Sequence, residues 1–173
     1  MPPLPDCTRP GARILFIGVN PGLRSGEIGH HFGGRGNPFW RLLHASGITP
    51  VLLTPEEDVR LPEFELGIVN MCHRPTRTAA ELTRGEIAEG RRTLRESILE
   101  LEPKVVAFAG LLLYQDFFAL PSSGGPGEKE QRIGGARVFA LPNPSGINQQ
   151  FPGWKSKLEW FVRLREFAER VAG

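Results

Sequence analysis

The fold is decided by the stretch Arg13-Ile14-Leu15-Phe16-Ile17-Gly18-Val19-Asn20-Pro21-Gly22, an apolar run that stops at a small, polar, turn-forming cluster. An apolar run ended by glycine is typical of a strand buried on both faces, and the Pro-Gly pair predicts a tight turn at its carboxyl end. In open α/β sheets, ligands bind at this edge. The polar side chain held there is Asn20, whose amide donates and accepts hydrogen bonds but is no strong base near neutral pH. A site built on Asn20 must therefore work through positioning and polarity.

Length and composition indicate one globular domain over residues 1–173. The chain is 40% hydrophobic and 23% charged, which suits a single domain with a real core. Residues 1–10 contain four prolines and predict an irregular lead-in of little function. The net charge of +2 and the pI of 8.8 allow a nucleic-acid partner without demanding one.

Cysteine usage and hydropathy indicate a reducing compartment and no membrane association. Cys7 and Cys72 are too few for a disulfide framework or a four-cysteine cluster, and neither belongs to a Cys-x-x-Cys pair. No basic start leads into an apolar signal segment, and no apolar run approaches the ~20 residues of a membrane helix. We expect a cytosolic protein with two reduced thiols.

Periodicity predicts three further core strands, at residues 66–71, 104–109 and 137–141. Helices are predicted at 37–47, at a short segment capped by Thr54, from the Thr83-Arg84-Gly85-Glu86 capping box to about 101, and at 111–119 and 154–171. Parallel strands need crossover connections, which are usually helices. Four strands alternating with helices therefore predict an α/β fold whose mainly parallel sheet is covered on both faces.

Residues 23–36 predict a long functional loop that forms a binding wall, because they are rich in glycine and carry several polar side chains. His30 and His31 are expected at the surface of this loop. Without an acidic or thiolate partner at ligand spacing, they do not predict a zinc site. No metal and no cofactor are expected.

The first and last predicted strands both end in Asn-Pro motifs, Gly18-Val19-Asn20-Pro21-Gly22 and Asn143-Pro144-Ser145-Gly146. If those strands run parallel, both motifs lie at the same rim. Between them stand His31-Phe32, Asn37-Pro38-Phe39-Trp40 and Arg74-Pro75-Thr76. In order and spacing these blocks resemble the mismatch-specific uracil (thymine) DNA glycosylases of the uracil-DNA glycosylase superfamily. The resemblance covers about residues 13–151.

This resemblance implies a three-layer α/β/α fold with a short, mainly parallel sheet of four to five strands, no metal, and excision of a base flipped out of DNA. Hydrolysis of an N-glycosidic bond needs a water near the anomeric carbon and hydrogen-bond donors for the departing base. Asn20 matches the family's water-positioning asparagine. Asn143 stands where several relatives carry a histidine that stabilises the base anion. Because a carboxamide removes a proton poorly, we expect slow excision.

The resemblance also assigns the walls of the site. Phe32 matches the aromatic residue that stacks on the flipped base, and Ile147 matches the apolar wedge that fills the gap in the duplex. The predicted base pocket comprises Gly18, Val19, Pro21, Gly22, Phe32 and Asn70. The predicted wedge and opposite-strand group comprises Ser145, Gly146, Ile147, Asn148 and Gln149. Predicted phosphate contacts are Arg24, Ser25, Arg35, Arg74 and Arg77.

Two positions depart from the family pattern and bear on substrate range. Asn70 stands where a lysine occurs in some relatives, and Asn148-Gln149-Gln150 lacks the basic residue that often follows the wedge. Acceptance of thymine, hypoxanthine or etheno adducts depends on the pocket around residues 22–25.

The leading hypothesis is a monofunctional DNA glycosylase of base excision repair, because no motif lysine is placed to attack the sugar. Its substrate is uracil, and by extension thymine or another damaged base, mispaired with guanine in double-stranded DNA. We expect a monomer, cytoplasmic and nucleoid-associated, of prokaryotic type. Two alternatives stay open: a catalytically weak protein that binds mismatched DNA, and a nucleotide-binding α/β module. The second lacks both Gly-x-Gly-x-x-Gly and a P-loop.

Overall fold

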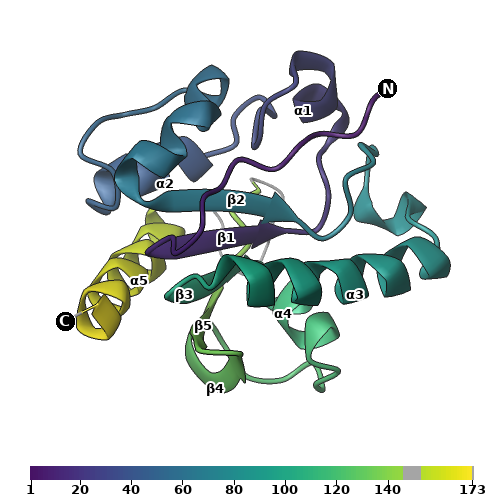
Figure 1. Ribbon diagram of the computed structural model, residues 1–173. Helices are drawn as coiled ribbons and strands as arrows, with labels where there is room; N and C mark the ends of the chain where they lie inside the picture. Colours follow the sequence, from purple (N-terminus) through teal and green to yellow (C-terminus); the bar gives the residue numbers. More distant parts are fainter. Residues whose placement is uncertain (146–152, 173) are drawn as a thin grey trace.

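The computed structural model describes residues 1–145 and 153–172, and it shows a mixed sheet with helices on both faces (Figure 1). The strands are β1 (Ile14–Gly18), β2 (Leu66–Asn70), β3 (Val105–Ala109), β4 (Gly127–Ile133) and β5 (Ala136–Leu141). Their order in the sheet is β2-β1-β3-β5-β4. All neighbours are parallel except β4, which pairs antiparallel with β5 at one edge. The predicted α/β class and the mainly parallel sheet are confirmed.

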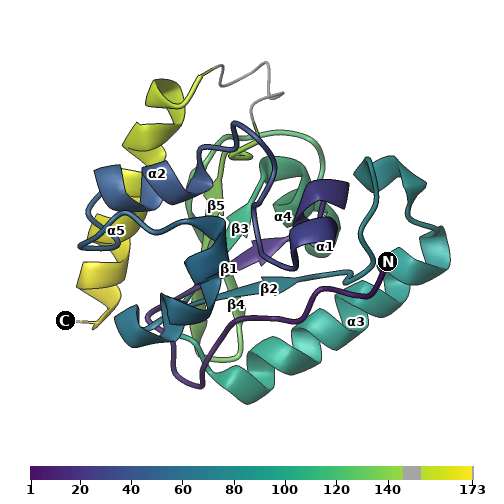
Figure 2. The same ribbon diagram turned by 90° about the horizontal axis from the view of Figure 1, so that it is seen from above.

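Side-chain alternation along the buried strands builds two separate cores. In β1, Ile14 and Phe16 pack into one core, whereas Leu15 and Ile17 pack into the other. The helices are α1 (Leu23–Ile28), α2 (Phe39–Ala45), the 3-10 helices η1 (Pro55–Phe64) and η2 (Ala79–Glu81), α3 (Arg84–Leu101), α4 (Leu111–Phe117) and α5 (Lys155–Ala172). The first core is closed by α2 and α5, which lie side by side in Figures 1 and 2, and the second by α3 and α4. Within the described residues, no helix is long and apolar enough to cross a membrane.

The predicted start of α3 is confirmed, whereas α2 begins one residue later than predicted. At α3 the Glu86 N–H donates to Thr83 Oγ1 at 3.1 Å, and the Thr83 N–H donates to a Glu86 carboxylate oxygen at 3.2 Å, which is a capping box. At α2, Asn37 Oδ1 accepts from the Phe39 N–H at 3.0 Å, although Pro38 and not Asn37 holds the cap position itself. These local hydrogen bonds fix where each helix begins.

The N-terminal lead-in is irregular apart from one isolated bridge, as predicted, but it is attached to the sheet. The Cys7 N–H donates to the Ile68 carbonyl at 3.0 Å and the Ile68 N–H donates back at 2.7 Å, so the chain forms a bridge along edge strand β2. The Leu4 N–H donates to the His73 carbonyl at 3.1 Å, and the Leu4 side chain is buried. The prolines keep this pairing short because they lack an N–H.

Two further elements differ from the sequence prediction. The segment 23–36, expected to be a loop, begins with helix α1. Strand β4 was not predicted: its sequence Gly-Glu-Lys-Glu-Gln-Arg-Ile is polar, and its residues alternate between half-buried and exposed at the sheet edge until the buried Ile133. Charged residues suit an edge strand because they discourage pairing with other chains.

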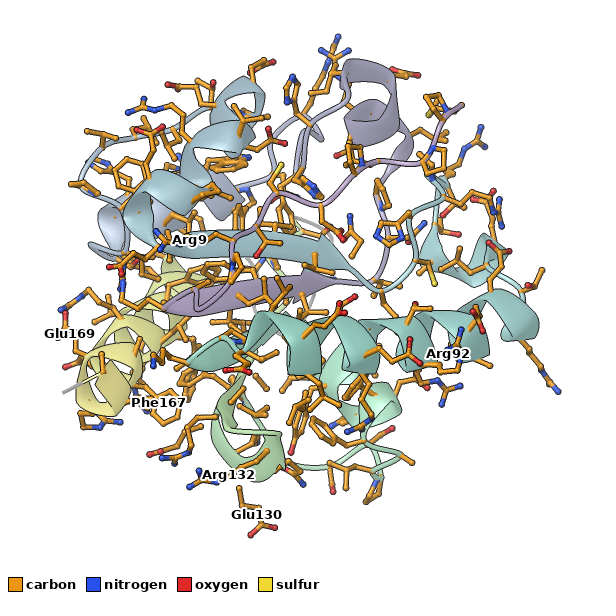
Figure 3. The ribbon with its side chains drawn as sticks, viewed as in Figure 1. Arg9, Arg92, Glu130, Arg132, Phe167 and Glu169 are labelled. Atoms are coloured by element: carbon orange, nitrogen blue, oxygen red, sulfur yellow. The ribbon has the colours of Figure 1, made fainter. Side chains whose placement is uncertain are left out.

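The surface carries charged side chains that point outward, among them Arg92, Glu130 and Arg132 (Figure 3). Arg92 pairs with Glu89 and Glu96 on the same face of α3, and all three side chains are largely exposed. Such exposed pairs contribute little to stability. This face of α3 is therefore a solvated helix surface.

Candidate active site

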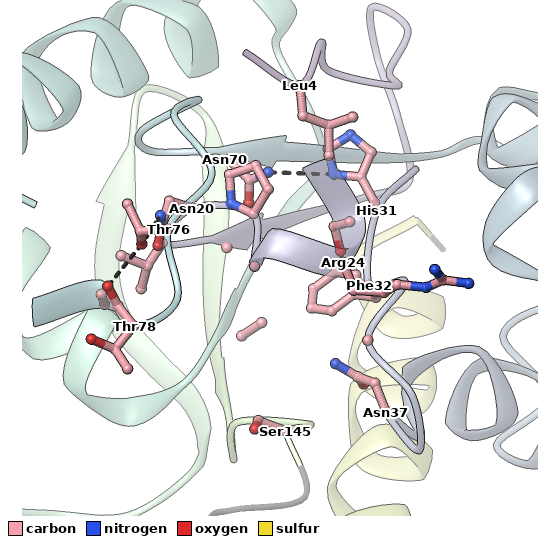
Figure 4. A pocket seen from close by; sticks show the side chains of 18 of the residues that line it. Leu4, Asn20, Arg24, His31, Phe32, Asn37, Asn70, Thr76, Thr78 and Ser145 are labelled. Atoms are coloured by element: carbon pink, nitrogen blue, oxygen red, sulfur yellow. Dashed lines mark hydrogen bonds between the residues drawn. The ribbon is translucent and has the colours of Figure 1, made fainter. Parts of the chain in front are cut away.

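A cavity of about 270 Å³ lies at the carboxyl edge of the sheet (Figure 4). The four parallel strands each bring a residue to its wall: Gly18 ends β1, Asn70 ends β2, Ala109 ends β3, and Asn143 follows β5. The two Asn-Pro motifs therefore share one rim, as parallel strands require. The remaining predicted pocket residues that line this cavity are Val19, Asn20, Pro21, Gly22 and Phe32.

The Asn20 side chain is held in one orientation on the cavity wall. Its amide nitrogen Nδ2 donates to the Arg74 carbonyl at 2.9 Å and to Thr76 Oγ1 at 2.7 Å. A carbonyl only accepts, so the nitrogen and not the oxygen must face Arg74. Both amide hydrogens are thereby used, and Oδ1 is left as an acceptor for a molecule in the cavity.

Phe32 provides an aromatic face to the cavity. Its ring stacks on the buried Phe39 ring with centroids 4.0 Å apart and planes inclined by 16°. Its backbone has φ +49°, in the left-handed region that favours glycine. Phe32 is half-buried rather than a core residue, so one side of the ring rests on the core while the residue lines the cavity.

Asn143 offers a hydrogen-bond donor to the cavity from the segment after β5. Its Oδ1 accepts from the Ser145 N–H at 2.9 Å, which leaves the amide nitrogen for a ligand. A buried lysine that sequence reasoning missed secures this turn: Lys157 Nζ donates to the Pro144 carbonyl at 3.3 Å and to the Ser145 carbonyl at 2.6 Å. Desolvation lowers the pKa of Lys157. Lys157 lies one turn before Phe161 and two turns before Leu164, so its spacing places it on the buried face of α5, and its partners at residues 144 and 145 reveal its role.

His31 corrects the prediction of a surface loop residue. Its exposed fraction is 2%, and its Nε2 donates to the Pro5 carbonyl at 2.8 Å. Nδ1 is then free of hydrogen and accepts from Asn70 Nδ2 at 3.4 Å (Figure 4). Burial lowers the pKa of His31, which favours this neutral form. Gly18 leaves room for the Asn70 amide, because a Cβ at Gly18 would lie 2.5 Å from Asn70 Oδ1.

The histidines also have the acidic and thiolate-forming neighbours that their sequence spacing did not show. Asp58 accepts from His30 Nδ1 at 3.0 Å and from the His31 N–H at 2.9 Å. One donor atom each from Cys7, His31 and Asp58 lies within 4.8 Å of the others. Burial and the Asp58 carboxylate raise the pKa of the Cys7 thiol to about 12. Asp58 thus links the His30 ring to the His31 backbone, beside a thiol whose ionised form is disfavoured by burial and by the Asp58 charge.

The predicted phosphate contacts fall into two groups. Arg24 and Arg77 line the cavity and are exposed. Arg35 is also exposed, in the segment that follows Phe32. None of these three arginines forms an ion pair with a described residue. Arg74 instead binds the Glu86 carboxylate through two nitrogens, at 2.7 and 2.8 Å. Its charge is therefore already partly neutralised.

Ser25 and the wedge segment complete the account of the predicted site. Ser25 is buried, lines the cavity, and its Oγ accepts from the Gly33 N–H at 2.9 Å, which ties α1 to the residue directly after Phe32. Ser145 also lines the cavity. The predicted wedge and opposite-strand residues Gly146, Ile147, Asn148 and Gln149 lie outside the described residues.

Comparison with known proteins agrees with this arrangement. The family model of the uracil DNA glycosylase superfamily matches residues 5–167. The chain belongs to the uracil DNA glycosylase superfamily. A solution NMR structure from Methanosarcina acetivorans, titled "putative Uracil DNA glycosylase", is similar in fold, with a TM-score of 0.61 and 18% sequence identity over 96% of this chain and 97% of that chain. Membership of the superfamily supports a DNA glycosylase, a hydrolase of DNA repair that acts on DNA.

Proposed function

We propose that this protein is a monofunctional DNA glycosylase that hydrolyses the N-glycosidic bond of uracil mispaired with guanine in double-stranded DNA. The orientation of Asn20 carries the proposal. With both amide hydrogens committed to Arg74 and Thr76, Oδ1 can accept a hydrogen from a water molecule in the cavity. That hydrogen bond turns a lone pair of the water toward the anomeric carbon of a bound nucleotide.

The Asn20 carboxamide can assist hydrolysis only by orienting the water molecule. A carboxamide cannot take the proton of the water at neutral pH, so the glycosidic bond must be largely broken before the water adds. Negative charge then develops on the departing base. The free amide nitrogen of Asn143 is placed to donate to that base, because its Oδ1 is occupied by the Ser145 N–H. Excision by these two amides is expected to be slow.

The cavity suits a single flipped base. Its volume of about 270 Å³ lies just below the range of roughly 300–1,000 Å³ that holds drug-sized ligands. The Phe32 ring supplies a stacking face, and the Asn70 amide, held by His31, supplies a polar wall for the base edge. Arg24 and Arg77 at the cavity can meet the flanking phosphates.

Preference for mismatches follows from the weak chemistry. Extruding a base costs a few kcal/mol and costs least when the base is mispaired. An enzyme without a general base cannot compensate for a large flipping cost by fast hydrolysis, so a G·U pair is favoured over a well-paired base. Acceptance of thymine needs room for a methyl group in the cavity.

Monofunctional action, in which the DNA strand is not cleaved, is supported by the lack of a free lysine amine among the described residues that line the cavity. Among the described residues that line the cavity there is no lysine, and the sequence of residues 146–152 contains none. The buried Lys157 amine is bound to two carbonyls. An imine with the sugar requires a free amine, so the product should be an intact strand with an abasic site.

The test is incubation of the protein with a labelled G·U duplex, followed by alkali or by borohydride. Strand breaks that appear only after alkali, and that are lost with Asn20→Ala, are expected. A protein–DNA adduct trapped by borohydride would refute monofunctional action. Tight binding to the G·U duplex without any excision would instead make the protein a mismatch-binding relative and overturn the proposed hydrolysis.

A further inference from the structure

The amide of Asn20 is one member of a directed chain of hydrogen bonds. Asn20 Nδ2 donates to Thr76 Oγ1 at 2.7 Å, and Thr76 Oγ1 lies 2.7 Å from the Thr78 carbonyl (Figure 4). A hydroxyl has one hydrogen, and the Thr78 carbonyl can only accept it. The Thr76 oxygen therefore meets Asn20 with a lone pair, and it cannot be the donor of that hydrogen bond.

The Thr76 hydroxyl is itself fixed in place. The residue is 3% exposed, and its N–H donates to the Pro21 carbonyl at 3.1 Å, which forms a parallel bridge beside Gly22. As a β-branched residue it has restricted freedom about χ1. The hydroxyl thus approaches Asn20 from a rigid backbone attached to the same turn that carries Asn20.

We propose that Thr76 is a positioning residue for hydrolysis, which acts through Asn20 by holding the amide plane so that Oδ1 faces the cavity. The inference rests on the proposed function, since it concerns the same reaction. The hydrogen bond to the Arg74 carbonyl is enough to keep Nδ2 and Oδ1 of Asn20 from exchanging places. A single hydrogen bond, however, still allows the amide group to rotate about that contact. The second bond, to Thr76, fixes the plane, and the Thr78 carbonyl ensures that Thr76 accepts rather than donates.

A pair of substitutions separates the hydroxyl from the shape of the side chain. Thr76→Val keeps the branched volume and removes the hydroxyl, whereas Thr76→Ser keeps the hydroxyl. Loss of one hydrogen bond of ordinary strength predicts a fall of roughly 2- to 12-fold in the maximal single-turnover excision rate on a G·U duplex. The enzyme concentration that gives half the maximal rate should stay the same, and Thr76→Ser should restore the rate. Thermal unfolding of both variants checks that each is folded.

A double-mutant cycle tests whether Thr76 acts through Asn20. In the Asn20→Ala background, Thr76→Val should cause no further loss, because the group that it positions is gone. A readout independent of catalysis is the side-chain NH₂ signal of Asn20 in the ¹⁵N NMR spectrum. Its hydrogens should exchange slowly in the wild-type protein and in Thr76→Ser, and faster in Thr76→Val.

Different outcomes would refute the positioning role of Thr76 and the catalytic role of Asn20. A folded Thr76→Val protein with the wild-type rate, in a background where Asn20→Ala is inactive, would show that Thr76 only shapes the backbone. If Thr76→Val lowers the rate further in the Asn20→Ala background, Thr76 does not act through Asn20, and the proposal is likewise refuted. Full activity of Asn20→Ala would instead refute the catalytic assignment of Asn20, whatever Thr76 does.

Discussion

Truncation of the Phe32 side chain tests whether its ring binds the flipped base, and a second substitution separates this effect from the effect on protein stability. The Phe32 ring stacks on Phe39 at 4.0 Å and also lines the cavity, so Phe32→Ala removes the surface on which a flipped base would rest. Stacking of a base on an aromatic ring contributes about 1–3 kcal/mol. This predicts binding of the flipped base weakened by about 5- to 140-fold, since each 1.4 kcal/mol is a factor of about ten.

The backbone of Phe32 supplies the matched control. At φ +49° an alanine keeps the strain of the left-handed conformation, whereas a glycine does not. We therefore expect Phe32→Gly to be more stable than Phe32→Ala by about 1 kcal/mol, a difference of about 2–4 °C in Tm for a chain of this size. Both variants lack the ring and should lose base capture equally.

The assay is a titration of enzyme against a trace of labelled G·U duplex under single-turnover conditions, with thermal unfolding measured in parallel. The concentration that gives half the maximal rate should rise to the same extent in both variants, although their melting temperatures differ. An Ala variant that captures substrate as the wild type does would refute the stacking role. A Gly variant that is no more stable than the Ala variant would refute the argument from backbone strain.

Two other perturbations follow from the structure. Gly18→Ala places a Cβ 2.5 Å from Asn70 Oδ1, so it should displace the Asn70 amide and lower the excision rate. The control is Gly135→Ala, whose Cβ would meet no atom within 4 Å and which should leave the excision rate unchanged. Equal excision rates for the two variants would contradict the role of Gly18. Arg74 and the Thr83 N–H lower the pKa of Glu86 from 4.5 to about 2, so its stabilisation is present above pH 4.5 and lost as the pH falls toward 2. Unfolding measured against pH should show a shallower acid loss in Glu86→Gln than in the wild type, and parallel curves would count against the ion pair.

Much of the fold was predictable because its signals are local. The residues of β1 are buried on both faces, and an unbroken apolar run is the expected sequence of such a strand. The capping box at Thr83 depends on residues three apart and was found for the same reason. Strand β4 escaped prediction because its polar alternation reflects the exposed edge of the sheet, which is known only once β5 is in place.

The candidate site was predictable where chain topology alone decides it. Asn20 and Asn143 share a rim because the strands before them are parallel. The burial of His31, by contrast, depends on Pro5, and that of Lys157 on the turn after β5. Such hydrogen bonds join segments that are separated in sequence, so the helical spacing of Lys157 indicates its burial but not the carbonyl groups that it binds.

The central claim is that the Asn20 amide positions the attacking water without acting as a base. Its most direct test is the maximal single-turnover rate of Asn20→Ala on a G·U duplex, with DNA affinity and Tm measured on the same preparation. We predict a fall of about 100-fold or more, the loss expected when a reactant is misplaced, with affinity and Tm nearly unchanged. Excision at the wild-type rate by the folded variant would contradict the claim.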